Sequence, residues 1–167
     1  QHFLCRDMPG ALQITKPASG EPWFAPQEWA AVRLSSKSHW DIPVTIGGKK
    51  LHILAMHPTP PTFDGPEDSN GKRNHDEIRL MADYLTPERA EYIYDDNGEK
   101  GGFAGQRFVL LGDFNAADIG DKHRPGVIEQ LTEHPLVNNS VIPQSEGGSE
   151  SRDTTCLWPQ YLAGSEG

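Results

Sequence analysis

The sequence is poor in cysteine and has no long apolar run. Its 167 residues include two cysteines, Cys5 and Cys156. Two cysteines are too few for a disulfide scaffold, and their separation matches no zinc-binding spacing, so one disulfide and two free thiols both stay open. No apolar run is long enough to span a bilayer, so we expect no membrane partner. The chain starts at Gln1 without a signal peptide, from which we expect a processed, trimmed or fragmentary N-terminus.

Basic residues are also scarce. Lys and Arg number 15 against 24 Asp and Glu, which gives a formal net charge of -9. This balance weighs against avid, non-specific binding to a large polyanion, because neutralising phosphates requires Lys and Arg. It does not exclude a nuclease, because bound metal cations offset local negative charge. The length allows one domain with a buried core.

Short apolar segments between loops rich in Gly and Pro predict an α/β fold with helices outside sheets. Strands are expected at residues 29–34, 42–46, 50–56 and 108–111, the last of them buried. Helices are expected at residues 75–85 and 127–131. Gly47-Gly48 predicts a two-residue hairpin turn. The long loop over 57–74 is of a length that is usually functional or disordered.

The segment Gly112-Asp113-Phe114-Asn115 carries the clearest chemical signal. An apolar strand there delivers a carboxylate and a carboxamide to one side of the chain, because they are two residues apart. Asp113 suits a group that orients or deprotonates water, and Asn115 suits one that holds a phosphoryl oxygen. An Asx turn after a strand explains the same residues without any function. Both interpretations stay open on these residues alone.

His57 ends an apolar strand, and the prolines that follow stiffen its loop. An imidazole held in this way can protonate a leaving oxygen or bind a phosphate, although a structural histidine at a strand end is the simpler interpretation. The loop after it is rich in acids, of which Asp68 is a weak candidate for a metal ligand together with Asp113. A solvated acidic loop is the alternative.

Three further residues are candidates for substrate binding. Arg33 opens a stretch dense in hydrogen-bond donors that runs to Asp41, and this stretch is either a substrate-contact strip or a polar loop. Asn74 is expected near the start of the helix over 75–85. Arg79 is expected on that helix, where an ion pair is the alternative role.

These motifs, in this order, resemble the endonuclease/exonuclease/phosphatase superfamily, whose best-known member is deoxyribonuclease I. The resemblance covers about residues 5–148 and rests on the strand that ends at His57 and on the segment Leu110 to Ala116. The segments over 57–68 and 73–79 and the stretch over 33–41 closely resemble a bacterial branch of the superfamily, whose members are often exported. The resemblance implies a four-layer α/β sandwich around two sheets and hydrolysis of phosphoesters that depends on Mg²⁺ or Mn²⁺. It assigns His57 as a catalytic histidine, Asp113 as the residue that orients or activates water, and Asn115 as a phosphate ligand.

Two parts of the family pattern have no counterpart in this sequence. The family carries a metal-binding Glu on an early strand and an Asp-His pair on a late strand, and neither is found. We therefore expect residues 1–148 to be a central, incomplete part of such a domain, followed by a mobile tail over 149–167. The alternative function is a truncated, inactive member that acts only as a structural or binding fragment. The substrate, a small molecule or a nucleic acid, and the oligomeric state stay open.

Overall fold

The structure is a computed structural model that describes residues 2–117 and 124–141. The chain divides into a unit over Gln1–Val137 and a second over Asn138–Gly167. In the second unit, the Ser140 hydroxyl donates to the side-chain oxygen of Asn138 at 2.7 Å. The tail predicted over 149–167 and Cys156 lie outside the described residues.

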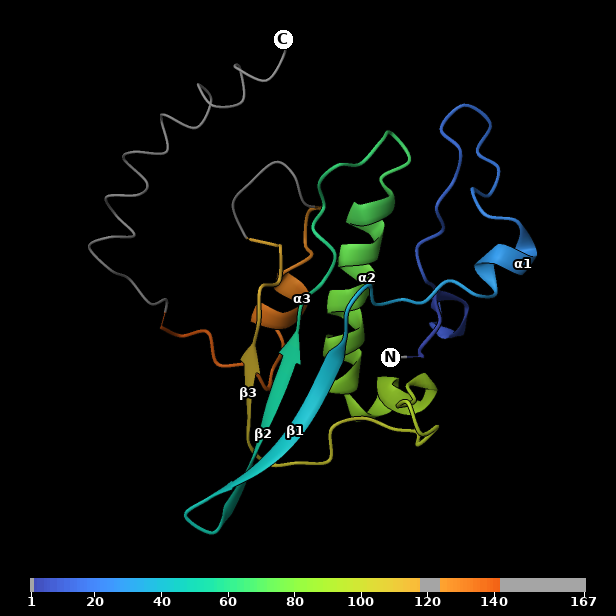
Figure 1. The fold of residues 1–167 in the computed structure, drawn as a ribbon. Helices are drawn as coiled ribbons and strands as arrows, with labels where there is room; N and C mark the ends of the chain where they lie inside the picture. The colour runs from blue at the N-terminus through green and yellow to red at the C-terminus, as the bar shows by residue number, and fades with distance from the viewer. Residues whose placement is uncertain (1, 118–123, 142–167) are drawn as a thin grey trace, which may run out of the picture. The chain divides into compact units, whose positions relative to one another are not determined.

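The first unit is built on a three-stranded mixed sheet in the order β1-β2-β3 (Figure 1). Its strands are β1 (His39–Ile46), β2 (Lys49–Met56) and β3 (Phe108–Leu111). β1 pairs antiparallel with β2, and β2 pairs parallel with β3. Gly47 and Gly48 join β1 to β2 with φ of 57° and 76°, the left-handed values that a type I′ hairpin turn requires. The α/β class, the hairpin and the position of β3 are thereby confirmed.

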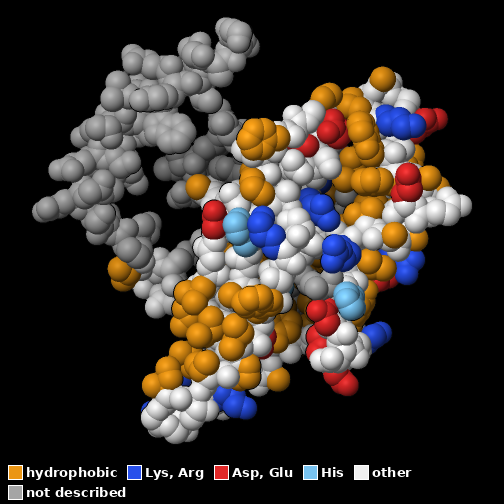
Figure 2. Space-filling view, viewed as in Figure 1, with side chains coloured by type: hydrophobic (Ala, Val, Ile, Leu, Met, Phe, Trp, Pro, Cys, Tyr) orange, Lys and Arg blue, Asp and Glu red, His pale blue; other side chains and the backbone are white. Residues whose placement is uncertain are grey.

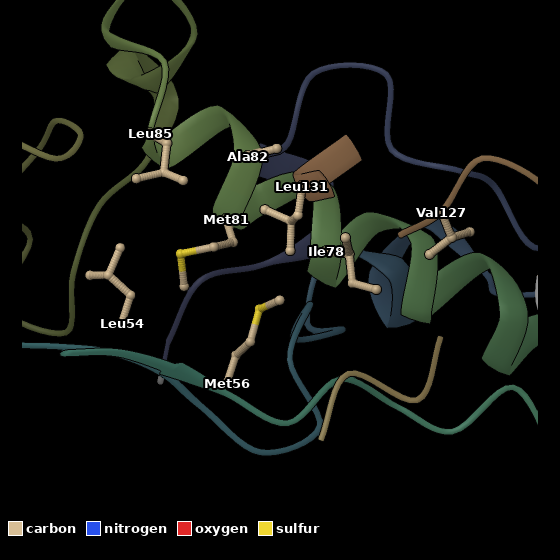
Figure 3. Packing of buried hydrophobic residues seen from close by; sticks show 8 residues of the cluster. All are labelled: Leu54, Met56, Ile78, Met81, Ala82, Leu85, Val127 and Leu131. Atoms are coloured by element: carbon tan, nitrogen blue, oxygen red, sulfur yellow. The ribbon is translucent and has the colours of Figure 1, made fainter. Parts of the chain in front are cut away.

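One face of the sheet is covered by helix α2 (Ser69–Tyr84) and by the short helix α3 (Glu129–Thr132) (Figure 1). Figure 3 shows Leu54 and Met56 of β2 pointing toward Ile78 and Met81 of α2. Both strand residues are buried, as are Leu85, Val127 and Leu131 around them. Burying a side chain of this size stabilises a fold by about 1.5–3 kcal/mol. The core therefore fixes α2 against the strands that lead to His57 and Asp113.

Helix α2 begins earlier than the sequence predicts. Its first turn, from Ser69, lies in the segment that was expected to be loop. The side chain that caps this turn belongs to Asp64, which precedes the helix by five residues. The Asp64 carboxylate accepts hydrogen bonds from the backbone N–H groups of Ser69, Asn70 and Gly71, at 2.9, 2.6 and 3.0 Å. These are donors that the first turn of a helix leaves without an intrahelical partner. The prediction that Asn74 lies near the helix start is therefore wrong, because α2 begins at Ser69 with a first turn that Asp64 caps.

The N-terminal segment packs on another side of α2. It contains the 3-10 helix η1 (Cys5–Asp7) and the helix α1 (Pro26–Trp29), and it meets the 3-10 helix η2 (Pro87–Tyr92) in a second apolar cluster. The strand predicted over 29–34 is wrong. Pro26 opens a helical turn, and the Glu28 carboxylate accepts a hydrogen bond from the Ala25 N–H at 2.8 Å, so the chain turns where a strand was expected. Of that segment, Arg33 forms a single antiparallel bridge with Leu4.

The other face of the sheet is apolar and open. Leu54 and Met56 face α2, so the alternate residues of β2, which are Leu51, Ile53 and Ala55, face away from it. Their register partners on β1 and β3 lie on the same side of the sheet. This open face consists of Trp40, Ile42, Val44, Leu51, Ile53, Ala55, Val109 and Leu111. Figure 2 shows hydrophobic side chains gathered over the sheet. The expectation that the strand over 108–111 is buried is wrong on this side, where Val109 and Leu111 are 42% and 46% exposed.

Cys5 is a free, buried thiol, and burial raises its pKa to about 11.

Over the ranges 2–117 and 124–141, no helix is both long enough and apolar enough to cross a membrane.

Candidate functional site

The parallel pairing of β2 and β3 brings two predicted site residues together. Ala55 and Leu111 are the last partners in the register, and His57 and Asp113 each follow two residues later. Their side chains meet at the carboxyl ends of the strands, with 3.9 Å between His57 Nε2 and Asp113 Oδ2. This is longer than a direct hydrogen bond, and the side chains are 45% and 68% exposed. The pair is therefore open to solvent, and a water molecule can contact both side chains from the exposed side.

Gly112 is what lets Asp113 approach the end of β2. Its φ is 139°, a value that L residues rarely adopt, and a Cβ atom there would lie 1.9 Å from the carbonyl oxygen of Met56. The backbones after the two strands are thus in close contact just before His57 and Asp113. Glycine is needed at this position for steric reasons as well as for its backbone conformation.

Asn115 closes the turn that carries Asp113. Its backbone N–H donates to Asp113 Oδ1 at 3.1 Å, and its φ of 50° is left-handed. Its side-chain amide donates to the carbonyl oxygen of Pro58 at 3.1 Å, which links the loop after β3 to the loop after β2. One proton of that amide is used in this link, and the second is available to another acceptor.

Asn74 lies beneath these loops rather than beside them. Its side chain is on α2 and is 1% exposed. Its amide nitrogen donates to the carbonyl oxygens of Thr59, Phe114 and Asn115, at 2.9, 3.0 and 3.4 Å, while its amide oxygen is buried with no hydrogen-bond partner. Asn74 was a candidate for substrate binding, and in the structure its amide is turned toward backbone carbonyls inside the fold.

Glu77, which the sequence did not single out, is the most deeply placed charged group of the site. Its side chain is 0% exposed. One carboxylate oxygen accepts from the Ser36 N–H at 3.0 Å, and the other accepts from the Thr59 N–H. The Thr59 hydroxyl donates to the Ser36 hydroxyl at 3.0 Å. The helical spacing of Asn74, Glu77 and Ile78 was the signal that could have placed Glu77 on the inner face of α2.

A histidine lies next to Glu77. His39 Nε2 is 2.9 Å from the backbone oxygen of Glu77, to which it donates. Burial lowers the pKa of His39, and this effect outweighs the opposing influence of the Glu77 backbone and carboxylate. The neutral imidazole is therefore favoured in the folded chain.

The other predicted site residues lie apart from His57 and Asp113. Arg33 is exposed, and its backbone oxygen accepts from the Arg73 guanidinium. Arg79 pairs with Asp76 at 3.5 Å, on a part of α2 where Asp76 also accepts from the Leu12 N–H at 2.6 Å. Arg79 thus faces the N-terminal segment, which agrees with the ion-pair role.

The candidate metal ligands do not form a cluster. Asp68 is bonded to the guanidinium of Arg124, which occupies one of its oxygens. Asp113 keeps an exposed carboxylate of the kind that hard cations prefer. Within residues 2–117 and 124–141, no three His, Cys, Asp or Glu side chains are grouped so that they could hold a metal ion. The described residues therefore fit Mg²⁺ or Mn²⁺ only in part, with Asp113 as a single candidate ligand.

Comparisons of the chain with protein-family models, with curated proteins and with solved structures gave no match.

Proposed function

We propose that this chain carries the water-orienting and phosphate-binding part of a metal-dependent phosphoester hydrolase. The observation that supports it is the pair His57 and Asp113, which two neighbouring parallel strands present to solvent with 3.9 Å between Nε2 and Oδ2. A carboxylate and an imidazole this close lie on the same side of a bound phosphate, which suits a carboxylate that orients the attacking water and an imidazole that binds a phosphoryl oxygen beside it. Asn115, in the loop after β3, is anchored to Pro58 in the loop after β2 and so links the two loops.

In the proposed reaction, a water oxygen attacks phosphorus while the bond from phosphorus to the ester oxygen breaks. Asp113 orients the water and accepts its proton through Oδ2, because Oδ1 is held by the Asn115 N–H. His57 donates a hydrogen bond to a phosphoryl oxygen, and the leaving oxygen takes its proton from solvent on the side opposite the attacking water. The free proton of the Asn115 amide binds a phosphoryl oxygen. A divalent cation would supply charge neutralisation at the phosphate, with Asp113 as the candidate ligand among the described residues.

We also propose that the first unit belongs to a four-layer α/β sandwich of the endonuclease/exonuclease/phosphatase type. The open apolar face of the sheet supports this, since a face made of residues such as Trp40, Ile53 and Leu111 is suited to packing against a second sheet. The order of the strands and of the helix between His57 and Asp113 agrees with the motif order in the sequence.

A second candidate is a family member that binds phosphoesters or a partner without hydrolysing them. It is favoured by one observation, the lack of a grouped set of metal-ligating side chains among the described residues. The two candidates differ in whether the chain turns over substrate when Mg²⁺ or Mn²⁺ is added.

The test is hydrolysis of phosphomonoesters and phosphodiesters, including short oligonucleotides, with Mg²⁺, with Mn²⁺ and with chelator. The decisive variant is Asp113→Asn, because asparagine keeps an oxygen to accept from the Asn115 N–H and removes the proton acceptor. We expect turnover to fall by about 10²–10⁴-fold, the usual contribution of a general base. Glu88→Ala, at an exposed acid on η2, is the control and should retain activity. A folded chain without metal-dependent turnover would favour the second candidate, and full activity of Asp113→Asn would refute the site.

A further inference from the structure

We infer that Glu77 and Asn74 are positioning residues that set the distance between His57 and Asp113 from inside the fold, an inference that rests on the proposed function. The two side chains lie one turn apart on α2 and bind the backbone of the loops on which the site is built. Neither has a surface through which it can reach a substrate, since they are 0% and 1% exposed.

The choice of glutamate at a buried position needs an explanation. A carboxylate loses much hydration when it is buried, and an apolar side chain of similar size often stabilises a core as well or better. What Glu77 provides instead is two acceptors of fixed separation, used by backbone groups that lie 41 and 18 residues away in the sequence. It therefore holds Ser36 and Thr59 at a defined distance from α2 and from each other.

Asn74 makes the corresponding link to the loop after β3. Its amide donates to Thr59 on one side and to Phe114 and Asn115 on the other. An amide nitrogen shared by three carbonyl oxygens draws both loops to the same point on α2. The Asn115 amide adds a second connection through Pro58.

Thr59 is the point where these connections meet. Its N–H is bound by Glu77 and its carbonyl oxygen by Asn74, so both polar groups of this backbone unit are held by α2. His57 lies two residues before Thr59. Asp113 directly precedes Phe114 and Asn115, whose carbonyl oxygens Asn74 binds. A change at Glu77 or Asn74 therefore moves one loop relative to the other. A misplacement of about 1 Å in a catalytic group can reduce a rate by about 10²-fold.

The test uses Asn74→Asp, which keeps the shape and removes the donors, and Glu77→Gln, which replaces one acceptor with a donor. The matched controls lie on the same helix. Asn70→Asp removes an amide that donates to Thr62 at 2.8 Å, and Asp83→Asn changes a carboxylate that accepts from the Tyr92 hydroxyl at 2.8 Å. Folding of every variant is checked by circular dichroism. If Asn74→Asp does not fold, Asn74→Ala removes the donors without placing a charge in the core.

Two measurements are made on each folded variant. The first is the change in the NMR chemical shifts of the His57 ring that Asp113→Asn causes when it is added to that variant. This change reports on how close the two side chains are, and it can be measured in an inactive chain. We expect this response to fall at least about two-fold in the Asn74 and Glu77 variants and to persist in the controls. The second is the split between kcat and KM, where we expect kcat to fall by about 10–100-fold with KM nearly constant.

The outcomes separate the inference from the proposed function. An unchanged His57 response in folded Asn74 and Glu77 variants overturns the positioning role, whether or not the chain is active. An equal loss in the controls also overturns it, because the effect would then be general to α2. A reduced response in a chain without turnover supports the positioning role and refutes the proposed hydrolase activity of this chain.

Discussion

Replacing Asp64 with alanine tests how α2 is held at the end that faces the candidate site. The Asp64 carboxylate accepts from three successive N–H groups of the first turn, and it is part of the loop that starts at His57. Loss of a capping side chain costs about 0.5–2 kcal/mol. Loss of a negative charge at a helix N-terminus adds about 0.3–1 kcal/mol. We therefore expect Asp64→Ala to lower the free energy of unfolding by about 1–3 kcal/mol.

The intermediate variant is Asp64→Asn. Asparagine keeps one oxygen, which can accept from Asn70 and Gly71, and loses the charge and the bond to Ser69. Asp64→Asn should lower the free energy of unfolding by about 1 kcal/mol, less than Asp64→Ala does. Urea unfolding followed by circular dichroism measures both values. A loss of 1 kcal/mol corresponds to a fall in Tm of about 2–4 °C for a domain of this size.

The control for this experiment is Asp95→Ala. Asp95 also accepts from backbone N–H groups, those of Asn97 and Glu99 at 2.8 and 2.9 Å, and backbone bonds are the main cause of its lowered pKa. Asp95 lies in an exposed loop, so water can accept the backbone hydrogen bonds that its carboxylate accepted. We therefore expect little change in the free energy of unfolding. If Asp64→Ala unfolds within about 0.5 kcal/mol of the native chain, or no earlier than Asp95→Ala, the capping argument is refuted.

Two further predictions follow from the surroundings of the site. Since burial lowers the pKa of His39 in the folded chain below its ordinary value of 6.5, the unfolded chain takes up protons more readily and stability should fall as pH drops below 6.5. Urea midpoints measured from pH 7.5 to 5 should show this fall, and His39→Gln should flatten it in part, the remainder being due to His134, whose pKa burial also lowers. Gly112→Ala should lower the free energy of unfolding by about 1–3 kcal/mol, because the new Cβ would meet the Met56 carbonyl. It should also abolish activity and the chemical-shift response of the His57 ring to Asp113→Asn. A Gly112→Ala chain of native stability would contradict the close approach of the two strands.

The features predicted correctly are those that depend on neighbours in sequence. Two glycines in a row require left-handed backbone, which fixes the hairpin between β1 and β2. The run Phe108–Leu111 is apolar and short, and it forms β3 with the same bounds. The pairing of β2 with β3 joins distant segments and was not predicted from the sequence, although it brings the two predicted residues His57 and Asp113 together.

The features that were missed depend on contacts between distant segments. The start of α2 is set by Asp64, whose role as a cap is not visible when the capping residue stands five residues outside the helix. Glu77 was not singled out, because nothing local shows that the N–H groups of Ser36 and Thr59 lie within its reach. The exposure of Val109 and Leu111 depends on what covers the sheet, which a four-residue apolar run does not encode.

The two interpretations of Gly112-Asp113-Phe114-Asn115, an Asx turn and a catalytic edge, are compatible in the structure. The turn uses Asp113 Oδ1, which accepts from the Asn115 N–H, and leaves Oδ2 directed toward His57. A carboxylate fixed through one oxygen has fewer orientations for the other, so the turn pre-organises the acceptor that the proposed reaction needs. Asp113→Asn preserves the first property and removes the second, which is why that substitution, rather than alanine, distinguishes a structural turn from a functional one.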